Sequence, residues 1–176
     1  MQFINTISKY GLISKLFHWV TLSFLIVQIP LGLYLVDMEF SEDRINLENI
    51  HVNLGLIIFY IILIRLIWKI LNPKPFLNYN SFPGQVYLAK INHFLLYICL
   101  ISVPISGILK KLYTGEKLNL FFTKIKLSET NFELSDFFYQ LHILSNYILI
   151  LLIIIHIFAV IVHHVIFKDK ILKKML

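Results

Sequence analysis

Four histidines at or inside long apolar stretches are the residues of this chain best suited to chemistry: His18, His51, His142 and His156. An ionisable side chain is costly inside lipid, so it usually faces a packed interior or a cofactor. A neutral imidazole offers a nitrogen to a metal, and two imidazoles on facing helices are a common way for a helical bundle to hold b-type haem. The residue types therefore point to redox chemistry at a nitrogen-ligated metal.

The spacing of these histidines predicts two levels of ligands. His142 and His156 are 14 residues apart, which is nearly four helical turns, so they share almost one face about 21 Å apart along the axis. His51 begins one apolar stretch at the level of His142, and His18 begins another at the level of His156. We expect an outer pair, His51 with His142, and an inner pair, His18 with His156. Spacing alone leaves His163 open as the inner ligand, because it follows His156 by seven residues on nearly the same face.

Five further residues fit this picture. Gly32 and Gly55 would let a flat macrocycle approach the backbone. Arg65 follows His51 by 14 residues, so it reaches the inner level, where it would pair with a haem propionate. His93 and His163 would contact a propionate or deliver protons to a quinone near the inner haem. Each residue also has a simpler explanation: helix–helix contact for a glycine, snorkelling for an arginine, and a hydrogen bond, a proton relay or an interfacial position for a histidine.

The elements that must position these residues are membrane spans. The chain has 176 residues, of which 58% are hydrophobic, whereas about half is usual for a soluble domain. Four stretches reach the roughly 20 residues that a span requires, at about residues 14–36, 50–70, 91–109 and 138–167. We expect one all-α domain over residues 1–176, a transmembrane four-helix bundle. The first stretch is too long for a signal peptide and lacks a small-residue cleavage site after Val36, so it is a retained anchor.

Charge and cysteine content narrow the class of protein. Of the 16 Lys and Arg residues, 10 fall on the side that holds both termini, so the positive-inside rule places both termini in the cytoplasm. Because the cations are split among short segments, we expect no nucleic-acid binding. The single cysteine, Cys99, excludes a disulfide framework within the chain, covalent haem attachment through a Cys-x-x-Cys-His motif, and an iron–sulfur cluster held by thiolates of this chain.

Taken in order, several short motifs resemble the prokaryotic cytochrome b561 family of small four-helix membrane cytochromes with two b haems. The resemblance covers nearly the whole chain. The matching residues are Lys15-x-x-His18-Trp19, His51-x-x-x-Gly55, Arg65-x-x-Trp68, Asn72-Pro73-x-Pro75, Leu96-Tyr97, Pro104-x-x-Gly107, His142, His156, His163-His164 and Lys168-Asp169-x-x-Leu172-x-x-Met175. A departure is Lys15, where many relatives carry arginine, which is also a cation.

The resemblance implies what the chain binds and does. The four axial ligands fall on His18, His51, His142 and His156, which favours His156 over His163. One look-alike in the family is described as a superoxide oxidase, which passes electrons from superoxide to ubiquinone. We therefore expect an oxidoreductase of the bacterial inner membrane that takes electrons outside and reduces ubiquinone. Five lysines cluster on the outer side: Lys110, Lys111, Lys117, Lys124 and Lys126. Their charge would steer a small anion toward the outer haem. The alternative is that they belong to a solvated loop with no such role.

Two other functions compete with this hypothesis. In the first, the chain is the haem b electron-transfer subunit that anchors a membrane dehydrogenase or hydrogenase. Such a subunit needs a surface on which its large partner docks. A haem-free transporter with a histidine proton relay is the third hypothesis, and the lack of repeat symmetry among four spans argues against it.

Overall fold

The computed structural model describes residues 2–75, 83–120, 123–168 and 172–175. Four helices follow one another along the chain, α1 (Leu12–Asp37), α2 (Glu42–Leu71), α3 (Gln85–Tyr113) and α4 (Phe132–Val165). Each is long and apolar enough to cross a membrane, and within a bilayer a helix satisfies its own backbone hydrogen bonds. The prediction of an all-α transmembrane four-helix bundle is confirmed.

All four helices begin earlier than the apolar runs indicated, and side chains cap the first turns of two of them, α2 and α4. The Ser41 hydroxyl accepts a hydrogen bond from Arg44 N at the start of α2, and the Asn131 side chain accepts one from Leu134 N at the start of α4. Side chains of these types satisfy backbone N–H groups that otherwise lack partners. The spans were predicted from runs of apolar residues, so the polar first turns of α2 and α4 were not included in them.

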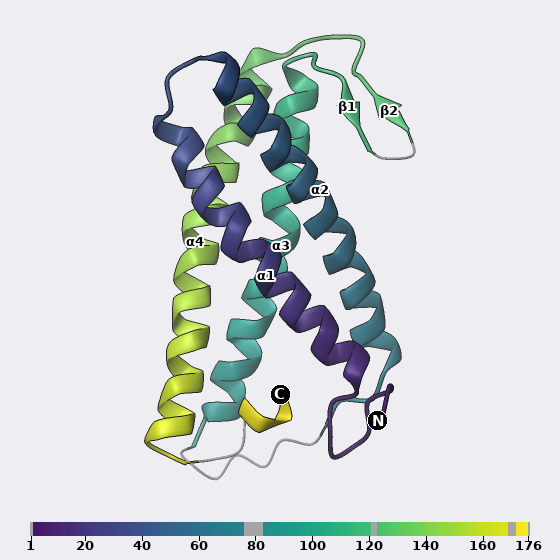
Figure 1. Ribbon diagram of the computed structural model, residues 1–176, viewed down its shortest axis with the longest axis vertical. Helices are drawn as coiled ribbons and strands as arrows, with labels where there is room; N and C mark the ends of the chain where they lie inside the picture. The colour runs from purple at the N-terminus through teal and green to yellow at the C-terminus, as the bar shows by residue number, and fades with distance from the viewer. Residues whose placement is uncertain (1, 76–82, 121–122, 169–171, 176) are drawn as a thin grey trace.

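The helices form two antiparallel hairpins, since α1 packs on α2 and α3 packs along α4 (Figure 1). Contact between α2 and α3 joins the hairpins. A buried apolar cluster lies at this junction: Ile58, Ile62, Cys99, Leu100, Leu149 and Leu152. Along α2 and α4 this cluster falls between the two levels of histidines, so it separates them.

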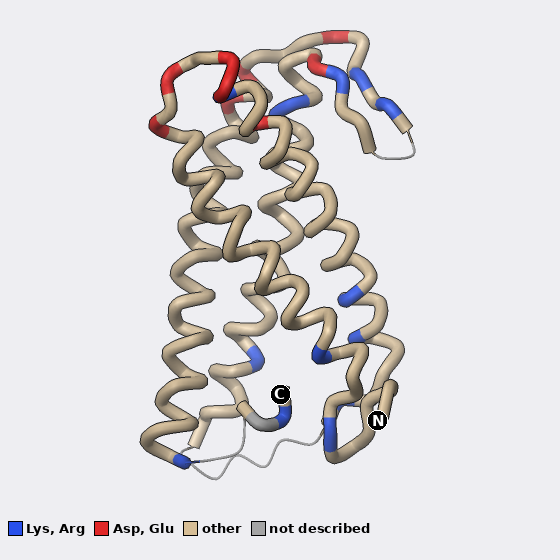
Figure 2. The backbone as a smooth tube through the Cα atoms, viewed as in Figure 1, with Lys and Arg blue, Asp and Glu red and all other residues tan. Residues whose placement is uncertain are grey.

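Polar residues lie mainly at the two ends of the bundle. Both termini lie at one end (Figure 1), and the acidic residues gather at the opposite end (Figure 2). We call the end with the termini the inner end; its cytoplasmic location remains a prediction. Of the inner segments, residues 76–82 of the Pro-rich linker and residues 169–171 near the C-terminus lie outside the described residues.

The loop between α3 and α4 contains a small hairpin that the sequence did not indicate. Strand β1 (Leu118–Asn119) pairs antiparallel with β2 (Lys124–Ile125). Leu118 is only 2% exposed, so the hairpin is anchored against the outer end of the bundle by this side chain. A single turn of η1 (Leu172–Lys174) lies near the C-terminus.

Candidate functional site

The structure brings the four histidines together in the two expected pairs. The ring centroids of His51 on α2 and His142 on α4 are 6.2 Å apart, and those of His18 on α1 and His156 on α4 are 6.3 Å apart. Metal–nitrogen bonds of about 2.0–2.1 Å, together with the size of the ring, put two imidazoles roughly 6 Å apart, centroid to centroid, when one metal lies between them. Both pairs therefore have the spacing that bis-histidine ligation of haem iron requires.

The geometry also distinguishes His156 from His163. His156 is the residue whose ring faces His18, whereas the ring of His163 lies beside Gln85, whose Nε2 is 2.8 Å from His163 Nε2. Gln85 is the first residue of α3 and is 4% exposed. His93 joins the inner pair, with its ring centroid 5.2 Å from that of His156. Three imidazoles thus meet at the inner level, and His163 lies one level further toward the termini.

The outer pair lines a cavity to which all four helices contribute. Its wall is largely apolar, with side chains such as Leu25, Ile29 and Leu149. Cations from Arg44, Lys110 and Lys111 also line it, and these residues belong to the outer ends of α2 and α3. An apolar cavity with two facing imidazoles and cations at its outer end suits haem b, which is a flat apolar macrocycle with two carboxylates.

His142 is held by the chain in an orientation that leaves a nitrogen for a metal. Its Nδ1 is 2.8 Å from the carbonyl oxygen of Val103 and 3.3 Å from the Ser106 hydroxyl, which is buried. A bond from Nδ1–H to a backbone carbonyl leaves Nε2 with its lone pair, which is the usual arrangement of a metal-binding histidine. A Cβ atom at Gly107 would lie 3.1 Å from His142 Cε1. From the sequence, Gly107 was noted only as part of a family motif, and its contact with the His142 ring was not predicted.

The glycines expected to face a macrocycle both line the outer cavity, and they also lie against protein side chains. A Cβ at Gly32 would lie 2.9 Å from His51 Cε1, and a Cβ at Gly55 would lie 3.3 Å from Gln28 Nε2. Because α1 and α2 pack together, these glycines lie at the contact between the helices. Their approach to a macrocycle remains a prediction, and in this structure Gly32 makes room for the His51 ring and Gly55 for the Gln28 amide.

Gln28 was not singled out from the sequence, yet it lies against His51. Its Nε2 donates a hydrogen bond to the backbone carbonyl of His51 over 3.0 Å and lies 3.3 Å from His51 Nε2. Two buried atoms here, Gln28 Oε1 and His51 Nδ1, have no hydrogen-bond partner among the described residues. A polar residue inside an apolar span is the signal that would have identified Gln28.

Cations surround the inner pair. Arg65 Nη2 donates to His18 Nδ1 over 3.1 Å, and the Arg65 guanidinium carbon lies 5.7 Å from the ring centre of Tyr97. Lys69 Nζ lies 3.9 Å from the same ring centre. Because arginine has no acceptor, this contact uses the single lone pair of the neutral His18 ring, so Arg65 would have to leave Nδ1 when His18 binds iron. The pairing of Arg65 with a haem propionate remains a prediction.

A polar cluster ties the N-terminal segment to the inner end of the bundle. Trp68 Nε1 donates to the Ser14 hydroxyl over 3.0 Å, and this hydroxyl donates to Asn5 Oδ1 over 2.7 Å. Asn5 is 8% exposed, and its Nδ2 donates to the carbonyl of Pro73 over 3.2 Å. The cluster joins α1, which carries His18, to the inner end of α2.

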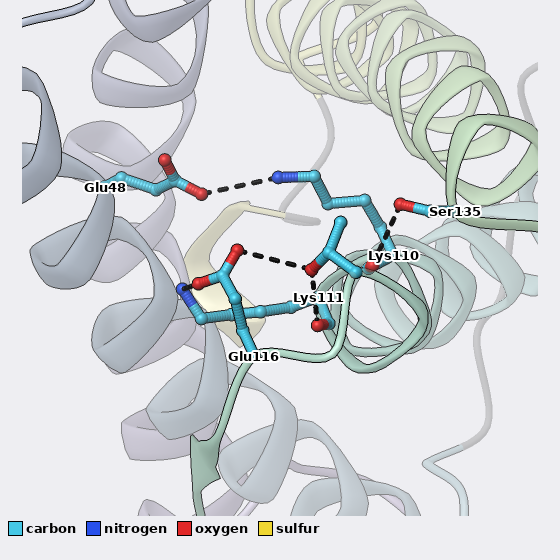
Figure 3. A network of polar contacts seen from close by, with 6 residues as sticks. Glu48, Lys110, Lys111, Glu116 and Ser135 are labelled. Atoms are coloured by element: carbon cyan, nitrogen blue, oxygen red, sulfur yellow. Dashed lines mark hydrogen bonds and ion pairs between the residues drawn. The ribbon is translucent and has the colours of Figure 1, made fainter. Parts of the chain in front are cut away.

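At the outer end, two of the five clustered lysines form ion pairs (Figure 3). Lys110 Nζ lies 3.4 Å from Glu48 Oε1, and Lys111 Nζ lies 2.8 Å from Glu116 Oε2. Burial alone would raise the pKa of Glu116, but the hydrogen bond and charge of Lys111 outweigh it and hold the pKa below its usual value. In the described part of the chain, the other three lysines of the cluster make no ion pair: Lys117, Lys124 and Lys126.

Comparison with known proteins shows the family to which the chain belongs. The family model described as prokaryotic cytochrome b561 matches residues 9–176. The cytochrome b561 homolog 2 of Escherichia coli is 28% identical over 180 residues, covering 100% of this chain and 95% of the relative. The protein named probable superoxide oxidase CybB of Yersinia pestis is 25% identical over 169 residues, covering 96% of each. The chain belongs to the prokaryotic cytochrome b561 family of membrane haem b electron-transfer proteins.

Proposed function

We propose that this chain carries electrons across the membrane between two b haems, an outer one held by His51 and His142 and an inner one held by His18 and His156. The observation that carries the proposal is the centroid separation of 6.2 and 6.3 Å in the two pairs. Bound haem b supplies one-electron chemistry, because its iron alternates between the ferric and ferrous states. The four histidines take no protons in this cycle and serve as neutral ligands.

At the outer end, the protein's own residues organise the approach of the electron donor. We propose superoxide as the donor, supported by the name of the Yersinia relative and by the positive charge of the hairpin. Lys117, Lys124 and Lys126 attract a small anion over a distance, which raises its association rate at low salt. Lys110 and Lys111 are already paired with carboxylates, so they add less to this field than the sequence suggested.

At the inner end, the proposed acceptor is ubiquinone, bound near His163 and His93. Reduction of a quinone consumes protons as well as electrons, and histidine is the side chain that exchanges protons near neutral pH. His93 lies against His156, and His163 lies beside Gln85 one level nearer the termini. These positions would relay protons from the inner surface. This assignment makes the protein a superoxide:ubiquinone oxidoreductase of the bacterial inner membrane, with both termini in the cytoplasm.

The haem content of single-histidine variants tests the ligation. The pyridine haemochrome assay should give two haems per chain for the natural protein and one for His142→Ala, because only the outer pair loses a ligand. His164→Ala is the matched control, since His164 is an exposed histidine of the same helix, and it should keep two haems. Two haems in His142→Ala would contradict the outer pairing. Ubiquinone reduction by superoxide with the purified chain alone would distinguish this function from that of an anchor subunit.

A further inference from the structure

Two residues that line the outer cavity have buried polar atoms with no hydrogen-bond partner among the described residues. Gln28 Oε1 and His51 Nδ1 make no hydrogen bond with the described residues, although the Gln28 amide nitrogen is 3.3 Å from His51 Nε2. Leaving a buried donor or acceptor unpaired costs free energy, so each such group calls for an explanation. Both atoms line the cavity that suits the outer haem.

The two histidines of the outer pair differ in what supports them. His142 has a backbone acceptor for its Nδ1–H, the carbonyl of Val103. A histidine that binds a metal through one ring nitrogen almost always donates its other N–H to an acceptor, which sets the tautomer and the orientation of the ring. The side chain within hydrogen-bonding distance of the His51 ring is Gln28, and its carboxamide offers an oxygen as well as a nitrogen.

We propose that Gln28 is the positioning residue of the outer haem, accepting through Oε1 the N–H of His51 when the opposite ring nitrogen binds iron. The last torsion of a glutamine side chain is soft, so the amide turns to present Oε1 to the ring while Nε2 keeps the His51 carbonyl. Both unpaired atoms are then satisfied, because Gln28 Oε1 accepts the proton of His51 Nε2 and His51 Nδ1 binds the metal. The inference rests on the proposed ligation by His51.

The packing around Gln28 supports a positioning role. The Gln28 amide packs against Gly55, where a Cβ would approach Nε2 to 3.3 Å, and the His51 ring packs against Gly32. A side chain at either glycine would press on the amide or the ring. The amide therefore holds His51 through both its main chain and its ring, from a neighbouring helix.

This bond has a measurable electronic consequence. A hydrogen bond from an axial imidazole to an acceptor makes the imidazole a stronger base, and a stronger donor favours ferric over ferrous iron. Gln28→Leu should therefore raise the reduction potential of the outer haem, and Gln28→Glu, with a charged acceptor, should lower it. At a fixed ambient potential the ferrous-to-ferric ratio of the outer haem should be several-fold higher in Gln28→Leu than in the natural protein, and that of the inner haem unchanged.

Asn92→Leu is the matched control. Asn92 is a carboxamide of α3 that lies outside the lining of the outer cavity and donates to a backbone carbonyl, that of Leu152, over 3.3 Å. It makes no hydrogen bond to an imidazole in the described structure, so its replacement should leave both potentials unchanged. If loss of any carboxamide inside the bundle disturbed the haems, the control variant and Gln28→Leu would shift the reduction potentials alike.

The experiment is a potentiometric titration of the purified cytochrome, followed by visible and electron paramagnetic resonance spectra, with haem counted per chain. Opposite shifts in Gln28→Leu and Gln28→Glu, confined to the outer haem, would support the proposal. No shift, shifts of one sign, or an equal shift in Asn92→Leu would overturn it. If Gln28→Leu fails to retain the outer haem, Gln28→Met replaces it in the comparison. Two haems in His51→Ala would instead show that the ligation itself is wrong, whatever Gln28 does.

Discussion

Replacing Gly32 by alanine tests the packing of the outer histidine pair. The new Cβ would lie 2.9 Å from His51 Cε1, whereas ordinary contacts begin at 3.4 Å. The ring must then move by about 0.5 Å, which exceeds the roughly 0.2 Å within which metal–ligand distances are held. We expect Gly32→Ala to lose the outer haem or bind it much more weakly. The assay is the haem-to-chain ratio from the pyridine haemochrome, with reduced-minus-oxidised spectra to identify which haem remains.

Two other glycines provide a graded comparison. Gly107→Ala brings a Cβ to 3.1 Å from His142 Cε1, so the ring must move about 0.3 Å and the loss should be smaller. Gly55→Ala meets the end of the flexible Gln28 side chain at 3.3 Å and should keep both haems. Alanine favours a helix over glycine by about 1 kcal/mol, so haem loss would not arise from a weakened helix. Full haem content in Gly32→Ala, or the reverse order among the three variants, would refute the packing argument.

Two further predictions concern the outer loop. The folded-state pKa of Glu116 is lowered by Lys111, so the pair stabilises the fold above the unfolded pKa of glutamate, about 4.3, and this contribution is lost as the pH falls through the lowered folded value. Thermal unfolding should thus show Glu116→Gln to be less stable than the natural protein at pH 7, with the difference vanishing in acid; a constant difference would contradict this. Changing Lys117, Lys124 and Lys126 together to Gln should slow reduction of the cytochrome by superoxide and weaken its dependence on salt. Stopped-flow absorbance measures both, and unchanged rates at low salt would show that the hairpin does not steer the donor.

The two levels of histidines could be predicted from the sequence, because the fixed period of a helix gives the relative positions of residues that are far apart along it. The 14-residue interval between His142 and His156 sets two ligand levels on one face of α4, and the partners His51 and His18 follow from the order of the spans. The capped first turns of α2 and α4 and the β1–β2 hairpin were not visible. These turns and the hairpin are short polar segments, and they lie outside the apolar runs from which the membrane spans were predicted.

Residues that depend on contact between helices were predicted less well. The sequence placed Gly32 and Gly55 near a macrocycle, and it did not indicate that they lie against His51 and Gln28. It also treated the outer lysines as a steering cluster or a solvated loop, whereas the fold brings Glu48 to Lys110. These contacts depend on how each helix is rotated and tilted against its neighbour, which the local sequence of either helix does not specify.

The sequence by itself determined that the chain crosses the membrane four times and carries histidines at two depths, because run length and helical period are properties of one segment at a time. Helical spacing left His156 and His163 both open, and the tertiary structure shows that His156 is the one that faces His18. Only the tertiary structure decided that Gln28 lies against His51. The physical reason is that rotation and tilt of transmembrane helices are set by side-chain packing between them. The side chains that meet across two helices are therefore known only once the bundle is assembled.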